Sequence, residues 1–561
     1  MSETHGVAAE VIEKDFLIVG TGGGGLLAAM KAKEAGLDAL VVEKTEYIGG
    51  STAMSGGVVW APANEYLLAE GYHDTLERGL AYLDAVVGDA GPATTRERKV
   101  AYLEGNLRML DFLKSQGVRL RYSASPDDYP DAPFGMVQGR ALEATIIHKD
   151  EIGAWEPYLR PSPLAMPIAL QTDDSATAVL AFRNPKNFAR MVKLIGRDVK
   201  AKARKRKLLT LGQALVGQIL IVMQQRGIDV WRETPMRDLL IEDGRVVGAV
   251  VERDGRRIEV RTRHGVLLAA GGFARNKELR EEYQPDPIDG GWTVANPGDE
   301  GDALRAGLGI GAATSNLDEA IWLPAPLLDG TPMLGIWERS LPHSIIVDGD
   351  GQRYMNESGP YMEAGQHMLR RNLETGKALP SWLIFDSRHR KRYPFVTAPP
   401  AQTPKAWLES GFLKKADTLE ELAAMCGIDA TGLRATVERF NGFARNGKDE
   451  DFHRGETRYD RYFGDPNNKG SNNLGTIEKG PFYAVGQIVT DVSTVGGLVT
   501  DTRARVLRED GSIIEGLYAS GCSAASVHGR IYPAPGASIS HSMTFGYIAA
   551  EDVIERRGAA A

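Results

Sequence analysis

A proline-rich stretch near the C-terminus combines a phenol with an uncovered backbone N–H group. It reads Tyr532-Pro533-Ala534-Pro535-Gly536. The two prolines restrict the backbone, Tyr532 offers a hydroxyl donor, and the N–H group of Gly536 has no side chain beside it. Two donors that converge on one point stabilise the charge that develops on the oxygen of an enolising carbonyl. The stretch therefore predicts a ketone site, with a rigid turn and a packing tyrosine as the alternative interpretation.

A second chemical signature is a glycine turn near the N-terminus. Residues 15–44 have the pattern strand, turn, helix and strand, and Gly20, Gly22 and Gly25 match G-x-G-x-x-G. The first glycine permits a tight turn, the second lets the backbone approach a pyrophosphate, and the third lets helix and strand pack closely. The helix N-terminus favours the phosphate charge. Glu43 ends the second strand, where an acid is expected to bind a ribose, so we expect a dinucleotide here.

Three further clusters of glycine and hydroxyl residues indicate that remote parts of the chain return to this nucleotide. They lie at residues 49–57, 265–272 and 516–521, and the first suits a long cofactor whose pyrophosphate is held from both sides. The residues expected to bind the cofactor are Gly20, Gly22, Gly23, Gly24, Gly25, Glu43, Lys44, Gly50, Ser51, Thr52, Ser55, Gly56, Gly57, Ala270, Gly271, Gly272, Gly521, Ser538 and Ile539.

These clusters resemble the FAD-binding domain of the fumarate reductase and 3-ketosteroid dehydrogenase flavoprotein superfamily, which makes FAD the expected cofactor. We expect noncovalent binding, because no attachment histidine stands beside residues 49–51. The proline-rich stretch is similar to the tyrosine-proline-glycine-proline-glycine motif of 3-ketosteroid Δ1-dehydrogenases, with Ala534 in place of a glycine. The resemblance implies that Tyr532 and the Gly536 N–H group hold the C3 ketone of a steroid.

The same resemblance assigns the general base to Tyr361, which would remove a proton from C2. Fumarate reductases carry an arginine at this offset from Asn356-Glu357, and a histidine before a threonine-x-glycine-glycine run. Neither residue stands at the matching position here, so the site lacks the positive charge that a dicarboxylate substrate needs. A site that contains tryptophan, proline and tyrosine suits an apolar ketone instead.

Tyr361 requires activation, because a phenol with a pKa of about 10 is a poor base at neutral pH. The resemblance places a helper tyrosine in the loop from Ser125 to Pro130. The aligned residue here is Asp128, and Tyr129 lies one place further on. Either Tyr129 supplies the phenol, or Asp128 takes the proton onward from Tyr361; a plain surface turn is the third possibility. A buried aspartate requires a polar partner.

A basic segment interrupts this otherwise acidic chain at residues 156–207. Residues 183–207 are rich in lysine and arginine and contain one acid, Asp198. Apolar residues recur among them at helical spacing: Phe188, Met191, Val192, Leu194, Ile195 and Val199. A basic amphipathic helix is typical of peripheral contact with an anionic membrane, and a solvated charged helix is the alternative. We expect membrane contact through residues 183–207.

Composition limits the remaining function classes. The chain has 561 residues, 43% hydrophobic and 25% charged, which is typical of a soluble protein with more than one domain. Its net charge of −8 argues against nucleic acid as a partner. Cys426 and Cys522 are the only cysteines, so a thiolate metal site is excluded, we expect no metal, and a reducing compartment is indicated. Without a secretory signal, we expect a cytoplasmic location, peripheral on the inner face of the cell membrane.

The elements that must position these residues predict an α/β fold. We expect a Rossmann-like FAD-binding domain with an inserted α+β substrate (cap) domain. The first part of the FAD-binding domain is expected at residues 1–317 and the cap at residues 318–480. Residues 481–561 are expected to complete the FAD-binding domain. Helical patterns occur at residues 74–87, 95–116, 418–426, 432–445 and 543–554, and the apolar stretch 208–223 predicts a buried helix.

The function implied by the resemblance is 1,2-desaturation of 3-ketosteroids. FAD would accept hydride from C1, and a membrane quinone is the expected external electron acceptor. A 3-ketosteroid 4-dehydrogenase and an enone or fumarate-type reductase on the same scaffold are the alternatives. A non-catalytic, membrane-recruited flavoprotein is the more distant one.

Overall fold

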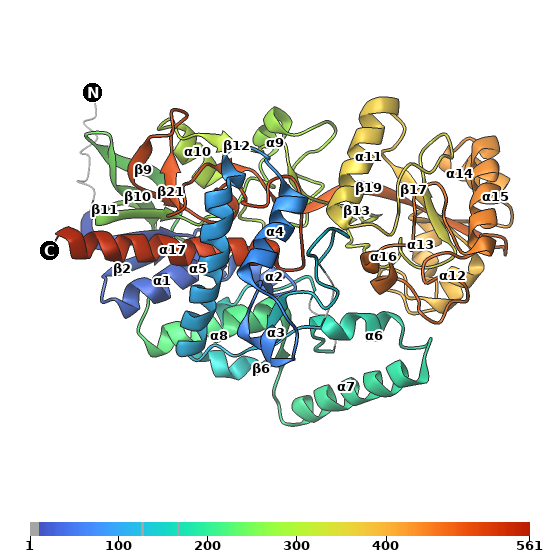
Figure 1. The fold of residues 1–561 in the computed structure, drawn as a ribbon, viewed down its shortest axis with the longest axis horizontal. Coiled ribbons are helices and arrows are strands. Elements are labelled where there is room, and N and C mark those ends of the chain that lie inside the picture. Colours follow the sequence, from blue (N-terminus) through green and yellow to red (C-terminus); the bar gives the residue numbers. More distant parts are fainter. Residues whose placement is uncertain (1–9, 125–127, 165–167, 561) are drawn as a thin grey trace.

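The computed structural model describes residues 10–124, 128–164 and 168–560. It has two lobes, each built on a sheet (Figure 1). Elements from both ends of the chain, blue and red in Figure 1, form the first lobe, whereas the yellow and orange middle of the chain forms the second. The chain therefore leaves the first lobe and later returns to it.

The first lobe contains an eight-stranded sheet with a parallel centre. Its main strand order is β21 (Arg505–Leu507), β22 (Ile513–Ala519), β11 (Arg256–Leu268), β1 (Glu10–Val19), β2 (Ala39–Val42) and β8 (Val230–Trp231). The pairs from β22 to β8 are parallel, and the hairpin of β9 (Met236–Glu242) and β10 (Arg245–Arg253) adds antiparallel strands to β11. Residues 16–19 of β1 are buried, as expected for a strand with both faces covered.

Helices cover this sheet (Figure 1). They are α1 (Gly23–Glu34), α4 (Leu76–Val87), α5 (Arg96–Ser115), α8 (Leu211–Gln225) and α17 (Ala537–Ala560). Their positions confirm the helices predicted at 74–87, 95–116, 208–223 and 543–554, and α8 is largely buried. α17 lies beside α1 in Figure 1, and a Cβ added to Gly546 would lie 2.2 Å from the carbonyl oxygen of Gly24. The two helices thus meet backbone to backbone.

The second lobe contains a five-stranded antiparallel sheet. Its strands are β13 (Ala320–Ala325), β16 (Ser344–Val347), β17 (Ser381–Phe385), β18 (Leu413–Ala416) and β19 (Phe482–Thr494). Helices α11 (Tyr361–Thr375), α14 (Leu419–Cys426) and α15 (Ala430–Asn446) accompany it. Because β19 pairs within this sheet, the predicted boundary at residue 480 would cut it. A boundary after Thr494 keeps the sheet whole.

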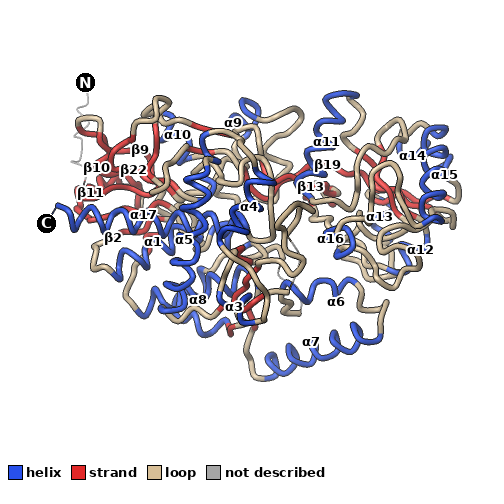
Figure 2. The backbone as a smooth tube through the Cα atoms, in the orientation of Figure 1, coloured by secondary structure: helices blue, strands red, loops and turns tan. Residues whose placement is uncertain are grey.

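The basic segment forms a helix at the edge of the molecule. α7 (Pro185–Ala203) follows α6 (Ser175–Val179) and runs along the margin of the view in Figures 1 and 2, apart from both sheets. This confirms the predicted amphipathic helix. In the described parts of the chain, no helix combines the length and apolar character needed to cross a membrane.

Candidate active site

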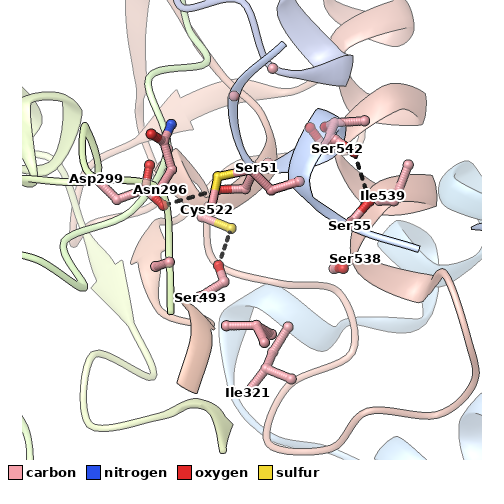
Figure 3. A pocket seen from close by; sticks show the side chains of 18 of the residues that line it. Ser51, Ser55, Asn296, Asp299, Ile321, Ser493, Cys522, Ser538, Ile539 and Ser542 are labelled. Atoms are coloured by element: carbon pink, nitrogen blue, oxygen red, sulfur yellow. Dashed lines mark hydrogen bonds between the residues drawn. The ribbon is translucent and has the colours of Figure 1, made fainter. Parts of the chain in front are cut away.

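A cavity of about 540 Å³ is lined by residues of both lobes. Of the residues expected to bind the cofactor, those lining it are Gly20, Gly22, Glu43, Lys44, Gly50, Ser51, Thr52, Ser55, Gly56, Gly57, Ala270, Gly271, Gly521, Ser538 and Ile539. Gly23, Gly24, Gly25 and Gly272 pack beside it and are not part of the lining. Figure 3 shows Asn296 and Asp299 on one wall, and Ser55 and Ser542 on the opposite one.

The glycine turn has the geometry that a dinucleotide phosphate needs. Gly20 has φ of 106°, and a Cβ there would lie 2.2 Å from the carbonyl oxygen of Ala269. A Cβ on Gly25 would lie 2.1 Å from the oxygen of Gly20, whereas one on Gly22 would have no neighbour closer than 3.9 Å. Gly22 is thus open towards the cavity and precedes the first turn of α1. The residues present therefore fit a pyrophosphate at this helix N-terminus.

Glu43 directly follows β2, and both of its carboxylate oxygens accept hydrogen bonds from threonines. One oxygen accepts from the N–H and hydroxyl groups of Thr21, at 3.2 and 2.5 Å, and the other from those of Thr45, at 3.0 and 2.9 Å. Thr21 was not identified from the sequence, although it lies inside the glycine turn. Its hydroxyl also accepts from the N–H group of Gly49, so it joins the turn to the second glycine cluster.

Asp299 is a second residue of the cavity that was not identified from the sequence. It lines the cavity and accepts a hydrogen bond from Ser51 at 3.3 Å (Figure 3). Burial raises the pKa of its carboxyl to about 7, although Ser51 and the charges of Lys44 and Arg160 oppose that shift. The run of turn-forming residues at 296–301 was the available signal. Its distance in sequence from the other glycine clusters concealed its place in the site.

Three predicted tyrosines meet in the same cavity. The ring centroids of Tyr129 and Tyr361 are 5.6 Å apart, those of Tyr129 and Tyr532 are 5.8 Å apart, and those of Tyr361 and Tyr532 are 5.6 Å apart. The N–H group of Tyr129 donates to the carbonyl oxygen of Pro533 at 2.8 Å, which ties its loop to the proline-rich stretch. Tyr459 packs on the other side of Tyr129, with 4.9 Å between centroids.

Tyr532 and Gly536 lie immediately before α17. Gly536 has φ of 84°, and a Cβ there would lie 2.3 Å from the carbonyl oxygen of Val58, so no other residue fits this turn. The Tyr532 hydroxyl lies 3.2 Å from that of Ser538. Burial raises the pKa of Tyr532, and contacts with Ser538, Tyr361 and the backbone of Gly536 reduce that rise. The Tyr532 hydroxyl and the Gly536 backbone therefore lie close together in the lining of the cavity.

Tyr361 is the first residue of α11 and is held as a neutral phenol. Burial, together with Tyr129 and Tyr532, raises its pKa well above the ordinary value. Burial likewise raises the pKa of Tyr129, and its contact with Tyr361 partly offsets this. Tyr361 can therefore accept a proton only in its phenolate form, which the surrounding groups would have to stabilise.

Asp128 faces away from the cavity lining and has the polar partners that burial requires. Its carboxylate accepts from the Trp60 indole at 2.8 Å and from the N–H group of Met136 at 3.0 Å, and it forms an ion pair with Arg140. The geometry thus brings Tyr129, rather than Asp128, to Tyr361. Residues 125–127 of this predicted loop lie outside the described residues.

Metal ligands do not assemble in the parts of the chain described. Residues 10–124, 128–164 and 168–560 contain no group of three or more histidine, cysteine, aspartate or glutamate side chains that could hold a metal ion. Cys426 and Cys522 are both free, and the Cys522 thiol lies 2.7 Å from the Ser493 hydroxyl (Figure 3).

Known proteins are similar to this chain in both sequence and fold. Residues 15–539 match the protein family described as FAD binding domain. A 3-oxosteroid 1-dehydrogenase from Mycolicibacterium smegmatis is 42% identical over 96% of this chain and 97% of that protein. A 3-oxosteroid 1-dehydrogenase from Comamonas testosteroni is 33% identical over 97% of this chain and 96% of that protein.

A solved structure extends the similarity to three dimensions. The crystal structure of 3-ketosteroid Δ1-dehydrogenase from Sterolibacterium denitrificans, in complex with 1,4-androstadiene-3,17-dione, has a TM-score of 0.91. It is 35% identical and covers 97% of this chain and 100% of that one. The chain therefore belongs to the FAD-binding flavoprotein family that contains the 3-oxosteroid 1-dehydrogenases.

Proposed function

We propose that the chain is an FAD-dependent 3-oxosteroid 1-dehydrogenase, which introduces a C1=C2 double bond into 3-ketosteroids. The observation that carries this proposal is the meeting of Tyr361, Tyr532 and Gly536 in the cavity that also contains the dinucleotide turn. When bound, FAD supplies the acceptor for the hydride that leaves C1. The protein supplies the groups that polarise the ketone and remove the C2 proton.

The architecture supports different roles for the two lobes. We infer that the first lobe is a Rossmann-like FAD-binding domain and that the second is an inserted cap. Gly20, Gly22 and the N-terminus of α1 would hold the pyrophosphate, and Glu43 would face the ribose. Residues of the second lobe close the cavity over the substrate.

Tyr532 and the Gly536 N–H group would hold the C3 carbonyl. Both are donors, and α17 begins at the next residue, so the positive end of a 24-residue helix adds to the field at this oxygen. Negative charge that develops on the oxygen as C2 loses its proton is stabilised there. Apolar side chains line the rest of the cavity and suit a steroid: Ile321, Leu323, Leu334, Ile336, Trp337, Phe463 and Val492.

Tyr361 would take the C2 proton. Tyr361 is the first residue of α11, and the positive end of that helix would favour the phenolate against the rise in pKa caused by burial. Tyr129 contacts Tyr361 and provides the next phenol to which the proton can pass. The buried ion pair of Asp128 with Arg140 supports a structural role for that aspartate instead.

The test is anaerobic mixing of the purified holoenzyme with androst-4-ene-3,17-dione. Bleaching of the flavin absorbance with formation of the 1,4-diene is the expected result. Bleaching only with a saturated 3-ketosteroid would move the assignment to a 4-dehydrogenase. Bleaching with neither would favour the non-catalytic alternative.

We also propose that α7 lies on an anionic membrane surface, from which a quinone accepts the electrons. Four apolar side chains at positions i, i+4, i+7 and i+11 are exposed: Phe188 at 50%, Val192 at 53%, Ile195 at 43% and Val199 at 59%. An apolar face left uncovered on a lysine-rich helix is the pattern of an interfacial helix. The same contact would help to collect a poorly soluble steroid.

A further inference from the structure

A second cavity, of about 440 Å³, is lined by residues of the second lobe and by Arg183, and it shares no lining residue with the first. Its charged lining residues are Arg183, Arg392, Arg445, Lys469 and Glu478. Four cations thus face one carboxylate in a chain whose net charge is −8. Concave surfaces with an excess of one charge concentrate counter-ions of the opposite sign.

Two of these cations are neutralised by carboxylates and two are not. Arg183 pairs with Asp465 at 2.7 Å, and Arg445 pairs with Glu478 at 3.0 Å. Throughout the residues that the structure describes, no carboxylate lies within 4.0 Å of the charged nitrogens of Arg392 or Lys469. The excess positive charge of the cavity therefore belongs to these two side chains.

Arg392 is oriented by a histidine that leaves its charge intact. Its Nη1 lies 2.8 Å from Nε2 of His343, while Nδ1 of His343 lies 2.8 Å from the carbonyl oxygen of Thr476. A carbonyl only accepts, so Nδ1 carries the proton and Nε2 accepts from Arg392. Burial lowers the pKa of His343 to about 4, so the ring is neutral at physiological pH. The guanidinium is thus held in place without a counter-charge.

The backbone around His343 is shaped to bring the ring into this position. His343 has φ of 70°, in the left-handed region that residues other than glycine rarely adopt. A Cβ on Gly475 would lie 2.6 Å from Nδ1 of His343, so the facing loop can approach only because it has no side chain there. On the same wall, the side chain of Asn467 is fixed by donation to Asp465 at 3.2 Å. The arrangement is that of a preorganised polar site.

We propose that this cavity binds a phosphate group, carried by a small phosphate monoester or by a phospholipid headgroup. The planar guanidinium of Arg392 matches two phosphate oxygens, and Lys469 adds a point charge. The volume suits a headgroup-sized ligand. A lipid source is considered because Arg183 of the cavity wall is separated from α7 by a single residue, Asn184. Phosphate of a lipid that contacts α7 would therefore lie near this cavity.

The test is calorimetric titration of the holoenzyme with glycerol 3-phosphate and with inorganic phosphate at constant ionic strength. A parallel arm measures sedimentation with phosphatidylcholine vesicles, with and without phosphatidic acid. Arg392→Gln and Lys469→Gln remove the two unpaired charges, and Lys469 is exposed, so its variant leaves the fold intact. Arg434→Gln is the matched control, because Arg434 is exposed on α15 outside the cavity.

We expect saturable binding that each cavity variant weakens about tenfold or more, while Arg434→Gln equals the wild type. Arg392→Lys should fall between the two, because it keeps the charge and loses the planar fork. Saturation by the soluble phosphates identifies a monoester site, and dependence on phosphatidic acid alone identifies a lipid headgroup. Steroid turnover of Lys469→Gln should be unchanged. Equal binding by the wild type and both cavity variants, or no saturable binding to any probe, would overturn the proposal.

Discussion

The ring of Tyr129 meets the ring of Tyr361 edge to face, with 5.6 Å between centroids and 73° between planes. Tyr129 comes from the connection between β4 (Leu120–Tyr122) and β5 (Ala141–Ala144), whereas Tyr361 opens α11 in the other lobe. The proposed base and its helper are therefore contributed by different parts of the fold. Their contact depends on how the two lobes are held together.

Replacing Tyr361 with phenylalanine should abolish most of the catalysis while leaving the cavity filled. We expect the rate of anaerobic flavin reduction to fall about 10²–10⁴-fold, because the variant has no group to accept the C2 proton. FAD content and steroid binding should be retained. Tyr354→Phe is the control, since its hydroxyl interacts with Ser381 and lies outside the cavity lining. An unchanged rate would remove Tyr361 from the mechanism.

Tyr129→Phe and Asp128→Asn should separate the two candidates for the helper. Tyr129→Phe is expected to slow flavin reduction about tenfold or more with little change in stability. Asp128→Asn is expected to lower the free energy of unfolding by about 3 kcal/mol, because it breaks a buried ion pair with Arg140. Its folded fraction should keep nearly the wild-type rate. The reverse pattern in stopped-flow and urea-unfolding experiments would assign the relay to Asp128.

The rate of flavin reduction should rise with pH. The pKa of Tyr361 is raised well above its ordinary value, so the fraction present as phenolate increases with pH throughout the neutral and alkaline range. We expect the observed rate constant to increase from about pH 6 to about pH 10 without a plateau. The residual rate of Tyr361→Phe should lack this slope. A plateau near neutrality in the wild type would indicate a different base.

Asp299 should make the stability of the cofactor-free protein depend on pH. Its folded-state pKa, about 7, exceeds that of the free carboxyl, so the folded state binds the proton more tightly than the unfolded state. The contribution of Asp299 to the free energy of unfolding is fully present below about pH 4, and it is lost as the pH rises to about 7. Asp299→Asn should therefore be the more stable protein at pH 8 by up to about 4 kcal/mol, and the gap should shrink at acid pH.

The measurement is the free energy of unfolding in urea for the wild type and Asp299→Asn across this pH range. Asp254→Asn, at an exposed turn, is the control and should leave the pH profile unchanged. Parallel profiles for the wild type and Asp299→Asn would show that the proton at Asp299 does not contribute.

The exposed face of α7 should govern binding to vesicles. The double variant Val192→Asp, Val199→Asp should bind vesicles of about 30% anionic lipid at least about tenfold more weakly, because it places charge on the apolar face. Its melting temperature should not fall, since both side chains are more than half exposed. Leu373→Asp, which alters another exposed apolar residue at 67%, is the control. Equal sedimentation of both variants would contradict a membrane role for α7.

The sequence predicted the parts of the site that depend on local spacing. The roles of Gly20, Gly22 and Gly25 follow from one turn, and the structure places each glycine as expected. The choice between Asp128 and Tyr129 was different, because it depends on a one-residue register. Contacts with Arg140, at the far end of the same connection, and with Pro533, remote in sequence, determine which side chain faces the cavity.

Two features of the fold differ from the sequence-based prediction. An apolar strand pattern does not specify its sheet, so β19 was assigned to the closing part of the FAD-binding domain although it pairs with β13 and β17. α17 begins at Ala537, before the predicted residue 543, directly after the left-handed turn at Gly536. Asp299 was missed because a loop residue gives no periodic signal.

The backbone contact between α1 and α17 has a mechanical consequence. Because Gly24 and Gly546 touch without intervening side chains, the glycine turn before α1 and the proline-rich turn before α17 are joined as one rigid unit. The proposed base on α11 belongs to a separate module. Substitutions in α11 would therefore change the proposed base while leaving the packing of α1 against α17 in place.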